Sequence, residues 1–332
     1  AMVRDVAYGG IAYRRRRVLH QRAGEILEQD AGDDVAGVAG LVSFHFAEAQ
    51  DHGRAWRYAR LAGERAEAVY ANVDAAAQYE LAVQVARSVV GVDDGERAQV
   101  LRRLGDVKLL AGELDGAIDA YSRALRLARD DVGARVELLL RRALVRRQAS
   151  AYSTALRDTT EGLQLAEALD GAELLRARAR LAVERSAIRR WQQQPAEALR
   201  LARQAELDAR QANDLETLAK ALDLIDWARR ITGDVDGASG YDEALAIFEQ
   251  LGDLIGVGLI WNNIGAEAFF EGRWEDAIAA YEKAREASLQ TGDHVSAAIA
   301  AANIAELLTN QGRLDEAEPL LREAIRVLTA SG

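Results

Sequence analysis

The Arg-Arg pairs at 146–147, 189–190 and 229–230 recur about 40 residues apart and are the clearest candidates for recognising a charged ligand. Their second members are Arg147, Arg190 and Arg230. A guanidinium presents a planar fork of donors that grips a carboxylate or a phosphate with two hydrogen bonds. On equivalent helices packed about 8–10 Å apart, the three would form a ladder that binds an acidic partner. The alternative is a solvated or internally paired set, since Asp226 stands four residues before Arg230.

The remaining residues predict no catalytic or metal chemistry. The chain has no cysteine, no phosphate-binding glycine loop and no His-Glu-x-x-His motif. His45 and His52 lie two helical turns apart, but a metal site needs a third ligand and none stands nearby. Pairs such as Glu275 and Asp276 suit the positive end of a helix dipole. We therefore predict no catalytic residue, no metal, no cofactor and no enzyme activity.

One phrase repeats along the sequence. A small residue is followed four positions later by a large one and seven positions later by another small one, as in Ala277, Tyr281 and Ala284. A full or shortened copy begins at Ala75, Ala117, Ala155, Ala198, Ala238 and Ala317. A period of about 40 residues indicates a stacked array of similar units.

Each unit reads as two helices. Offsets of three and four place the small and large residues on one side of a helix. A glycine turn precedes this second helix in EGRWEDA, QGRLDEA, TGDVDGA and AGELDGA, where glycine can adopt a positive φ. Asp214, Asp253 and Asp293 stand where the next helix needs an N-cap. Two prolines in 332 residues favour an all-α fold of roughly seventeen helices.

The pattern resembles the tetratricopeptide repeat. The residues that match its signature are Trp261, Ile264, Gly265, Gly272, Ala277, Tyr281 and Ala284. The match is strongest over 254–330 and 96–129. Because the period exceeds the usual 34 residues, the chain looks like the long-helix variant of signalling proteins. The resemblance implies a right-handed superhelix of antiparallel helix pairs, with ligands on a concave face lined by the first helix of each pair.

Eight residues are expected to form a binding site on that concave face. Arg147, Arg190 and Arg230 form the ladder, Trp227 and Phe269 are apolar anchors, and Asn262, Asn263 and Asn303 hold a peptide backbone. The competing interpretation places both aromatic rings in the core.

The N-terminal segment is not a repeat. Arg4 to Tyr8, then Arg17, His20 and Ala23, resemble the junction that follows the winged-helix region of STAND-type signalling ATPases, including multidomain class III nucleotidyl cyclases and large transcription regulators. There a short strand leads into a helix, and an ATPase lies upstream. We expect a junction strand and helix at 1–33, irregular repeat-like helices at 34–94 and six long repeats at 95–332.

The composition argues against some classes of partner and location. A net charge of −11 argues against a nucleic-acid partner. No apolar stretch is long enough for a membrane span, and the absence of cysteine suits the cytoplasm. We expect a non-enzymatic interaction and regulatory module of a larger signalling protein. Its partner would be a protein or peptide, acidic if the ladder binds it, or upstream domains of the same chain. The alternative is a stand-alone cytoplasmic receptor or scaffold of the pheromone-sensor type.

Overall fold

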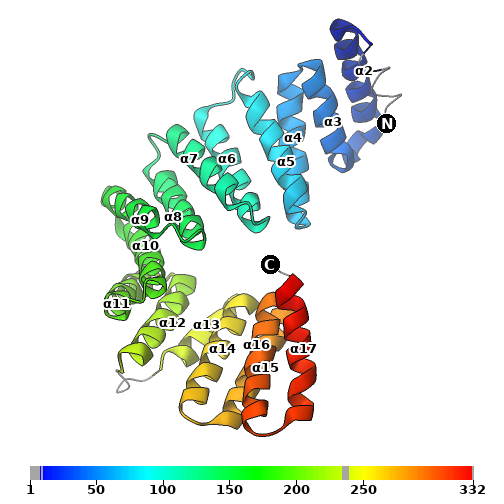
Figure 1. The fold of residues 1–332 in the computed structure, drawn as a ribbon. Coiled ribbons are helices and arrows are strands. Elements are labelled where there is room, and N and C mark those ends of the chain that lie inside the picture. Colours follow the sequence, from blue (N-terminus) through cyan, green and yellow to red (C-terminus); the bar gives the residue numbers. More distant parts are fainter. Residues whose placement is uncertain (1–7, 9, 234–238, 331–332) are drawn as a thin grey trace. The chain divides into compact units, whose positions relative to one another are not determined.

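The computed structural model describes residues 8, 10–233 and 239–330, and the part it describes is helical throughout with no strand. Sixteen α-helices in this part confirm the all-α fold class (Figure 1). None of the described helices is both long and apolar enough to cross a membrane. The strand expected at 4–8 falls outside the described residues, apart from Tyr8.

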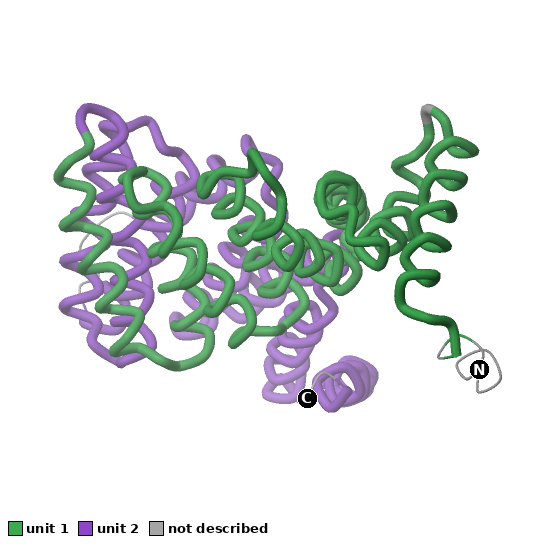
Figure 2. The backbone as a smooth tube through the Cα atoms, turned by 90° about the horizontal axis from the view of Figure 1, so that it is seen from above, with its two compact units in different colours: residues 1–169 green, residues 170–332 purple. Residues whose placement is uncertain are grey.

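The chain divides into two compact units, residues 1–169 and 170–332 (Figure 2). Unit 1 contains α2 (Tyr13–Ala31), a 3-10 turn (Gly32–Asp34), α3 (Val35–Ala49), α4 (His52–Ala68), α5 (Asn72–Ala86), α6 (Asp94–Leu110), α7 (Leu114–Leu127), α8 (Val132–Gln148) and α9 (Tyr152–Ala166). Unit 2 contains α10 (Gly171–Trp191), α11 (Pro195–Ala212), α12 (Leu215–Thr232), α13 (Tyr241–Leu251), α14 (Leu254–Phe270), α15 (Trp274–Gln290), α16 (His294–Asn310) and α17 (Leu314–Ala330).

The helices pair as the repeats predict. Six pairs, from α6 with α7 to α16 with α17, fill residues 94–330. The units divide between Leu169 and Asp170, inside this run of six pairs. The domain boundaries expected at 33/34 and 94/95 both lie inside unit 1 and stay a prediction.

The turns follow the expected chemistry. Each predicted turn glycine has a positive φ: Gly112 (80°), Gly233 (72°), Gly272 (76°) and Gly312 (77°). This left-handed region ends a helix at no steric cost only when the residue lacks a Cβ atom. Asp214, Asp253 and Asp293 are all N-caps, and each accepts a hydrogen bond from the backbone three residues later.

The small residues of the repeat allow close helix packing. A Cβ atom added at Gly105 would lie 2.4 Å from Cε1 of Tyr121, and one added at Gly265 would lie 2.8 Å from Cε1 of Tyr281. The aromatic ring of the second helix therefore lies directly on the backbone of the first. Gly63 with Tyr79 repeats the arrangement in α4 and α5.

Candidate binding site on the first-helix face of unit 2

The first helices of unit 2 are α10, α12, α14 and α16. We call the side that carries the predicted site residues the first-helix face. It is defined by Arg190, Asp223, Trp227, Arg230, Asn262, Asn263 and Asn303, with Ile255, Leu259, Val295 and Ile299. Arg147, by contrast, lies at the end of α8 in unit 1 and is half-buried.

A buried carboxylate lies at the centre of this face. Asp223 of α12 is 5 % exposed, accepts a hydrogen bond from Nδ2 of Asn263 at 2.6 Å, and lies 3.4 Å from Nη1 of Arg190. Burial raises the pKa of the Asp223 carboxyl, because it favours the neutral form more strongly than Arg190 and Asn263 favour the charged one. Asp223 therefore ties α10, α12 and α14 together.

Two of the predicted contact residues are engaged inside the protein. Trp227 is 7 % exposed and lies under the guanidinium of Arg190, whose Cζ is 5.2 Å from the ring centroid. Asn263 is 5 % exposed and is bound to Asp223. Trp227 therefore lies in the core, as the competing interpretation predicted, because α12 is buried along nearly all of its length. Phe269 is half-buried against the core of α14 to α17 and contacts Phe270 edge-on at 5.4 Å.

Arg230 has a different environment from Arg190. Its side chain makes no hydrogen bond or ion pair with any described residue, and its Nη1 atom is buried without a partner. The pairing with Asp226, which the alternative interpretation suggested, does not form. Instead the Asp226 carboxylate accepts hydrogen bonds from Ser239 Oγ at 3.0 Å and from the Gly240 backbone at 2.6 Å. The start of α13 thus competes successfully for Asp226, because backbone donors at a helix start have no helical acceptor.

A second unsatisfied polar atom lies in the same region. The hydroxyl of Tyr241, on α13, is buried without a hydrogen-bond partner, and the residue is only 3 % exposed. Burial raises the pKa of Tyr241, and the charges that act on it include those of Asp223, Arg230 and Glu267. Burial also raises the pKa of the Glu267 carboxyl. Buried polar groups normally find partners, so Arg230 and Tyr241 together have unused hydrogen-bonding capacity.

Asn262 of α14 and Asn303 of α16 are joined by a hydrogen bond. Nδ2 of Asn303 donates to Oδ1 of Asn262 at 3.3 Å, and both side chains are half-buried. This contact leaves each amide with further donor or acceptor positions. The structure therefore brings two of the three predicted asparagines together at the edge of solvent.

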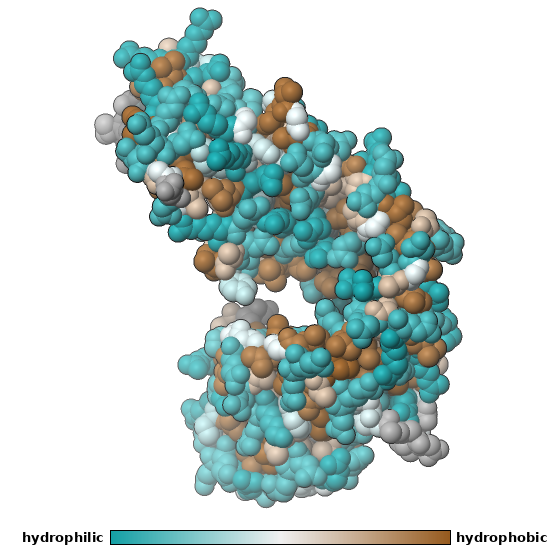
Figure 3. All heavy atoms as spheres, turned by 180° about the vertical axis from the view of Figure 1, so that it is seen from behind, coloured by the Kyte–Doolittle hydropathy of each residue, from teal (hydrophilic) through white to brown (hydrophobic). Residues whose placement is uncertain are grey.

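An exposed apolar strip lies on the same two helices, and the sequence reasoning did not identify it. Ile255 and Leu259 on α14 are 68 % and 43 % exposed, and Val295 and Ile299 at the matching positions of α16 are 40 % and 44 % exposed. Spacing of four places each pair on one side of its helix. The matching positions of α12 hold an ion pair, Glu216 with Lys220, so the strip ends there. Hydrophobic residues form patches on a mostly hydrophilic surface (Figure 3).

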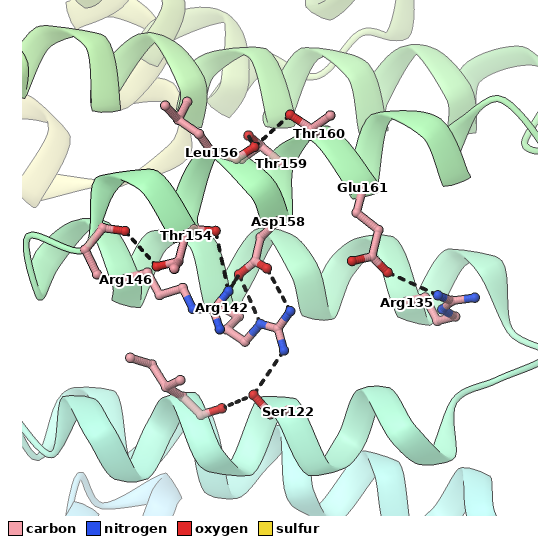
Figure 4. A network of polar contacts seen from close by, with 12 residues as sticks. Ser122, Arg135, Arg142, Arg146, Thr154, Leu156, Asp158, Thr159, Thr160 and Glu161 are labelled. Atoms are coloured by element: carbon pink, nitrogen blue, oxygen red, sulfur yellow. Dashed lines mark hydrogen bonds and ion pairs between the residues drawn. The ribbon is translucent and has the colours of Figure 1, made fainter.

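The first arginine of each Arg-Arg pair is held within the protein. Arg146 and Arg142 both bind Asp158, with Nη1 of Arg146 2.6 Å from Oδ2 (Figure 4). Arg189 donates to Gln192 at 2.7 Å, and Arg229 lies 4.0 Å from Asp226. Doublets at helix ends are thus partly structural, as expected for cations near the negative end of a helix dipole.

No metal site emerges in the described ranges. They contain no cluster of three or more His, Asp or Glu residues suited to a metal ion. His45 and His52 do not lie two turns apart on one helix, because α3 ends at Ala49 and His52 begins α4. Nδ1 of His45 lies 2.9 Å from Nδ1 of His20, whose Nε2 contacts the hydroxyl of Tyr8 at 2.7 Å.

Comparisons with known proteins agree with this architecture. Residues 256–330 match the model of the tetratricopeptide repeat family. Comparison with curated proteins gives no significant match. Among solved structures, the apo form of the quorum sensor NprR from B. thuringiensis has a TM-score of 0.67 at 12 % identity, covering 98 % of this chain and 91 % of that one.

Two further structures share the fold. A STAND protein with a tetratricopeptide repeat sensor from Pyrococcus horikoshii has a TM-score of 0.58 at 15 % identity, covering 96 % of this chain and 47 % of that one. The Rap conjugation gene regulator of the plasmid pLS20, in complex with the Phr peptide, has a TM-score of 0.55 at 13 % identity, covering 86 % and 75 %. Residues 256–330 are therefore a tetratricopeptide repeat region, and the chain has an all-α helical-repeat fold that resembles the repeat sensor of the STAND protein.

Proposed function

We propose that this chain is a non-enzymatic interaction and regulatory module that binds an extended peptide or protein segment on the first-helix face of unit 2. The observation that carries the proposal is the apolar strip of Ile255, Leu259, Val295 and Ile299 beside the Asn262–Asn303 pair. Exposed apolar side chains beside polar groups with free hydrogen-bonding capacity are typical of a binding surface.

Each part of the face has a distinct role in this proposal. The strip takes apolar side chains of the partner, while Asn262 and Asn303 bind its backbone amides. Arg230 takes an acidic group, because it alone of the unit 2 ladder residues has no internal partner. Arg190, Trp227 and Asn263 hold the face in shape through Asp223 and are positioning residues. Arg147 lies on α8 of unit 1 and is not part of this face.

The biological setting proposed is regulation inside the cytoplasm. The likeness to a STAND repeat sensor favours a module attached to an upstream ATPase or nucleotidyl cyclase, with the partner biasing one arrangement of the helices. The alternative is a stand-alone peptide receptor, favoured by the likeness to the peptide-bound Rap regulator. The coding sequence directly upstream separates them, since a phosphate-binding glycine loop supports the first and a start codon the second.

A random peptide display library selected against the purified chain tests the proposal. We expect enriched peptides with apolar residues and one acidic residue. Their binding should be lost in Leu259→Ser/Ile299→Ser and weakened in Arg230→Gln. The matched control is Leu207→Ser/Leu289→Ser, which removes two exposed leucines from the second helices α11 and α15. Equal binding by all variants would refute this site, and a library without enrichment would refute peptide binding.

A further inference from the structure

A pocket in unit 1 is lined by arginines, none of which belongs to the first-helix face of unit 2. It opens between the ends of α5 and α7 and the start of α6, and its volume is about 150 Å³. Arg87, Arg97, Arg123 and Arg126 line it, over apolar walls that include Val83 and Leu127. Small-molecule pockets commonly combine an apolar wall with a few polar groups in this way.

The charge of this pocket is poorly compensated. No Asp or Glu is among the described residues that line it. Arg97 and Arg123 each reach one carboxylate, of Asp94 and Asp119, at 3.4 Å. Those carboxylates are 63 % and 64 % exposed, so water weakens both ion pairs.

The other two guanidinium groups have no partner within the described protein. The side chains of Arg87 and Arg126 make no hydrogen bond or ion pair with a described residue, and both residues are exposed. The backbone oxygen of Arg126 accepts a hydrogen bond from Nε of Arg129 at 3.0 Å. Basic residues at helix ends gain something from the helix dipole. That gain does not require four guanidinium groups from three helices to converge on one hollow, in a chain with net charge −11.

One arginine is already held in position. Nη2 of Arg97 donates to the backbone oxygen of Ala86 at 3.3 Å, and its Nε atom is buried without a partner. A ligand therefore meets one guanidinium that the protein backbone already holds in place. Such preorganisation reduces the entropy lost on binding.

We propose that this basic pocket binds a small phosphate monoester that carries an apolar group. Four guanidinium groups with two weak internal partners leave an excess of about two charges, which a phosphate monoester matches because it carries about −1.5 to −2 at pH 7. Its three terminal oxygens can accept from several arginines at once. A carboxylate has one charge and needs a single guanidinium. Val83 and Leu127 provide the wall for the apolar group.

Calorimetric titration of the full chain with phenyl phosphate tests the proposal. Benzoate serves as the singly charged comparison and inorganic phosphate as the comparison without an apolar group. We expect phenyl phosphate to bind at least tenfold tighter than either, and its affinity to fall as salt is raised. Affinity for phenyl phosphate should fall at least tenfold in Arg87→Gln/Arg126→Gln.

The matched control is Arg22→Gln/Arg157→Gln, which removes two exposed, unpaired arginines of unit 1 outside the pocket. It should bind phenyl phosphate within twofold of the wild type. Equal loss in both double variants would show that net charge alone explains binding and would overturn the site. Benzoate binding as tightly as phenyl phosphate would overturn the assignment of a dianion. Equal affinity for inorganic phosphate would overturn the apolar wall, and no heat with phenyl phosphate would overturn the proposal.

Discussion

Replacing Gly105 by alanine tests the packing that defines the repeat. The added Cβ atom would lie 2.4 Å from Cε1 of Tyr121, whereas ordinary contacts begin near 3.4 Å, so ring and helix must separate by about 1 Å. Tyr121 is fully buried, and its hydroxyl donates to Oδ1 of Asp106 at 2.7 Å. That oxygen also accepts from Nη1 of Arg141 at 2.8 Å. The ring therefore cannot move without disturbing a network that joins α6, α7 and α8.

The expected cost combines two losses of stability and one gain. Overpacking of this kind costs about 1–3 kcal/mol, and a weakened hydrogen bond to a charged group adds about 1.5 kcal/mol. Alanine in place of glycine inside a helix regains about 1 kcal/mol. The net loss of unfolding free energy should thus be about 1.5–3.5 kcal/mol.

Urea denaturation followed by circular dichroism measures this loss, and hydrogen exchange locates it to α6 and α7. The matched control is Gly133→Ala in α8, where the nearest atom to the added Cβ, Oδ1 of Asp131, is 3.6 Å away. The control should be neutral or up to about 1 kcal/mol more stable. In a Tyr121→Leu background the cost of Gly105→Ala should shrink. A Gly105→Ala chain as stable as the wild type, or an equal cost in both backgrounds, would refute the reasoning.

Three further perturbations test the buried polar groups. Asp158→Ala leaves the guanidinium groups that bind Asp158 without their carboxylate, and should cost about 3–5 kcal/mol in urea denaturation; a cost under about 1 kcal/mol would mean that water replaces the carboxylate. Burial raises the pKa of Asp223, so the folded state binds more protons than the unfolded one. Wild-type stability therefore declines as pH rises above 3.8 through the folded pKa. Asp223→Asn should flatten this decline, and an unchanged pH profile would contradict the prediction. Burial, and then the charge of His20, lower the pKa of His45, so the stability present at neutral pH is lost as pH falls below 6.5. In His45→Gln, hydrogen exchange of α2 and α3 should no longer speed up on acidification. An unchanged acid response would exclude the histidine pair as the source of that loss.

Local features of the fold could be predicted from the sequence because each depends on a few neighbouring residues. The turn glycines, the N-caps at Asp214, Asp253 and Asp293, and the repeat phrase all follow from φ preference, capping and helical periodicity. The Asp226–Arg230 pair, suggested as an alternative to the ladder, does not form because it depends on a contact from another helix. The backbone N–H of Gly240, at the start of α13, donates to Asp226, and the residue spacing within α12 cannot predict that contact.

The binding site shows the same division. The sequence by itself determined the repeat period, the all-α fold and the positions of Arg190, Arg230, Asn262 and Asn303 on first helices. Only the tertiary structure decided which of these side chains are bound to other residues of the protein, because burial and pairing depend on helices about 40 residues apart. Arg190 is bound to Asp223 across α10 and α12, while Arg230, on the same helix as Asp223, keeps an unsatisfied donor.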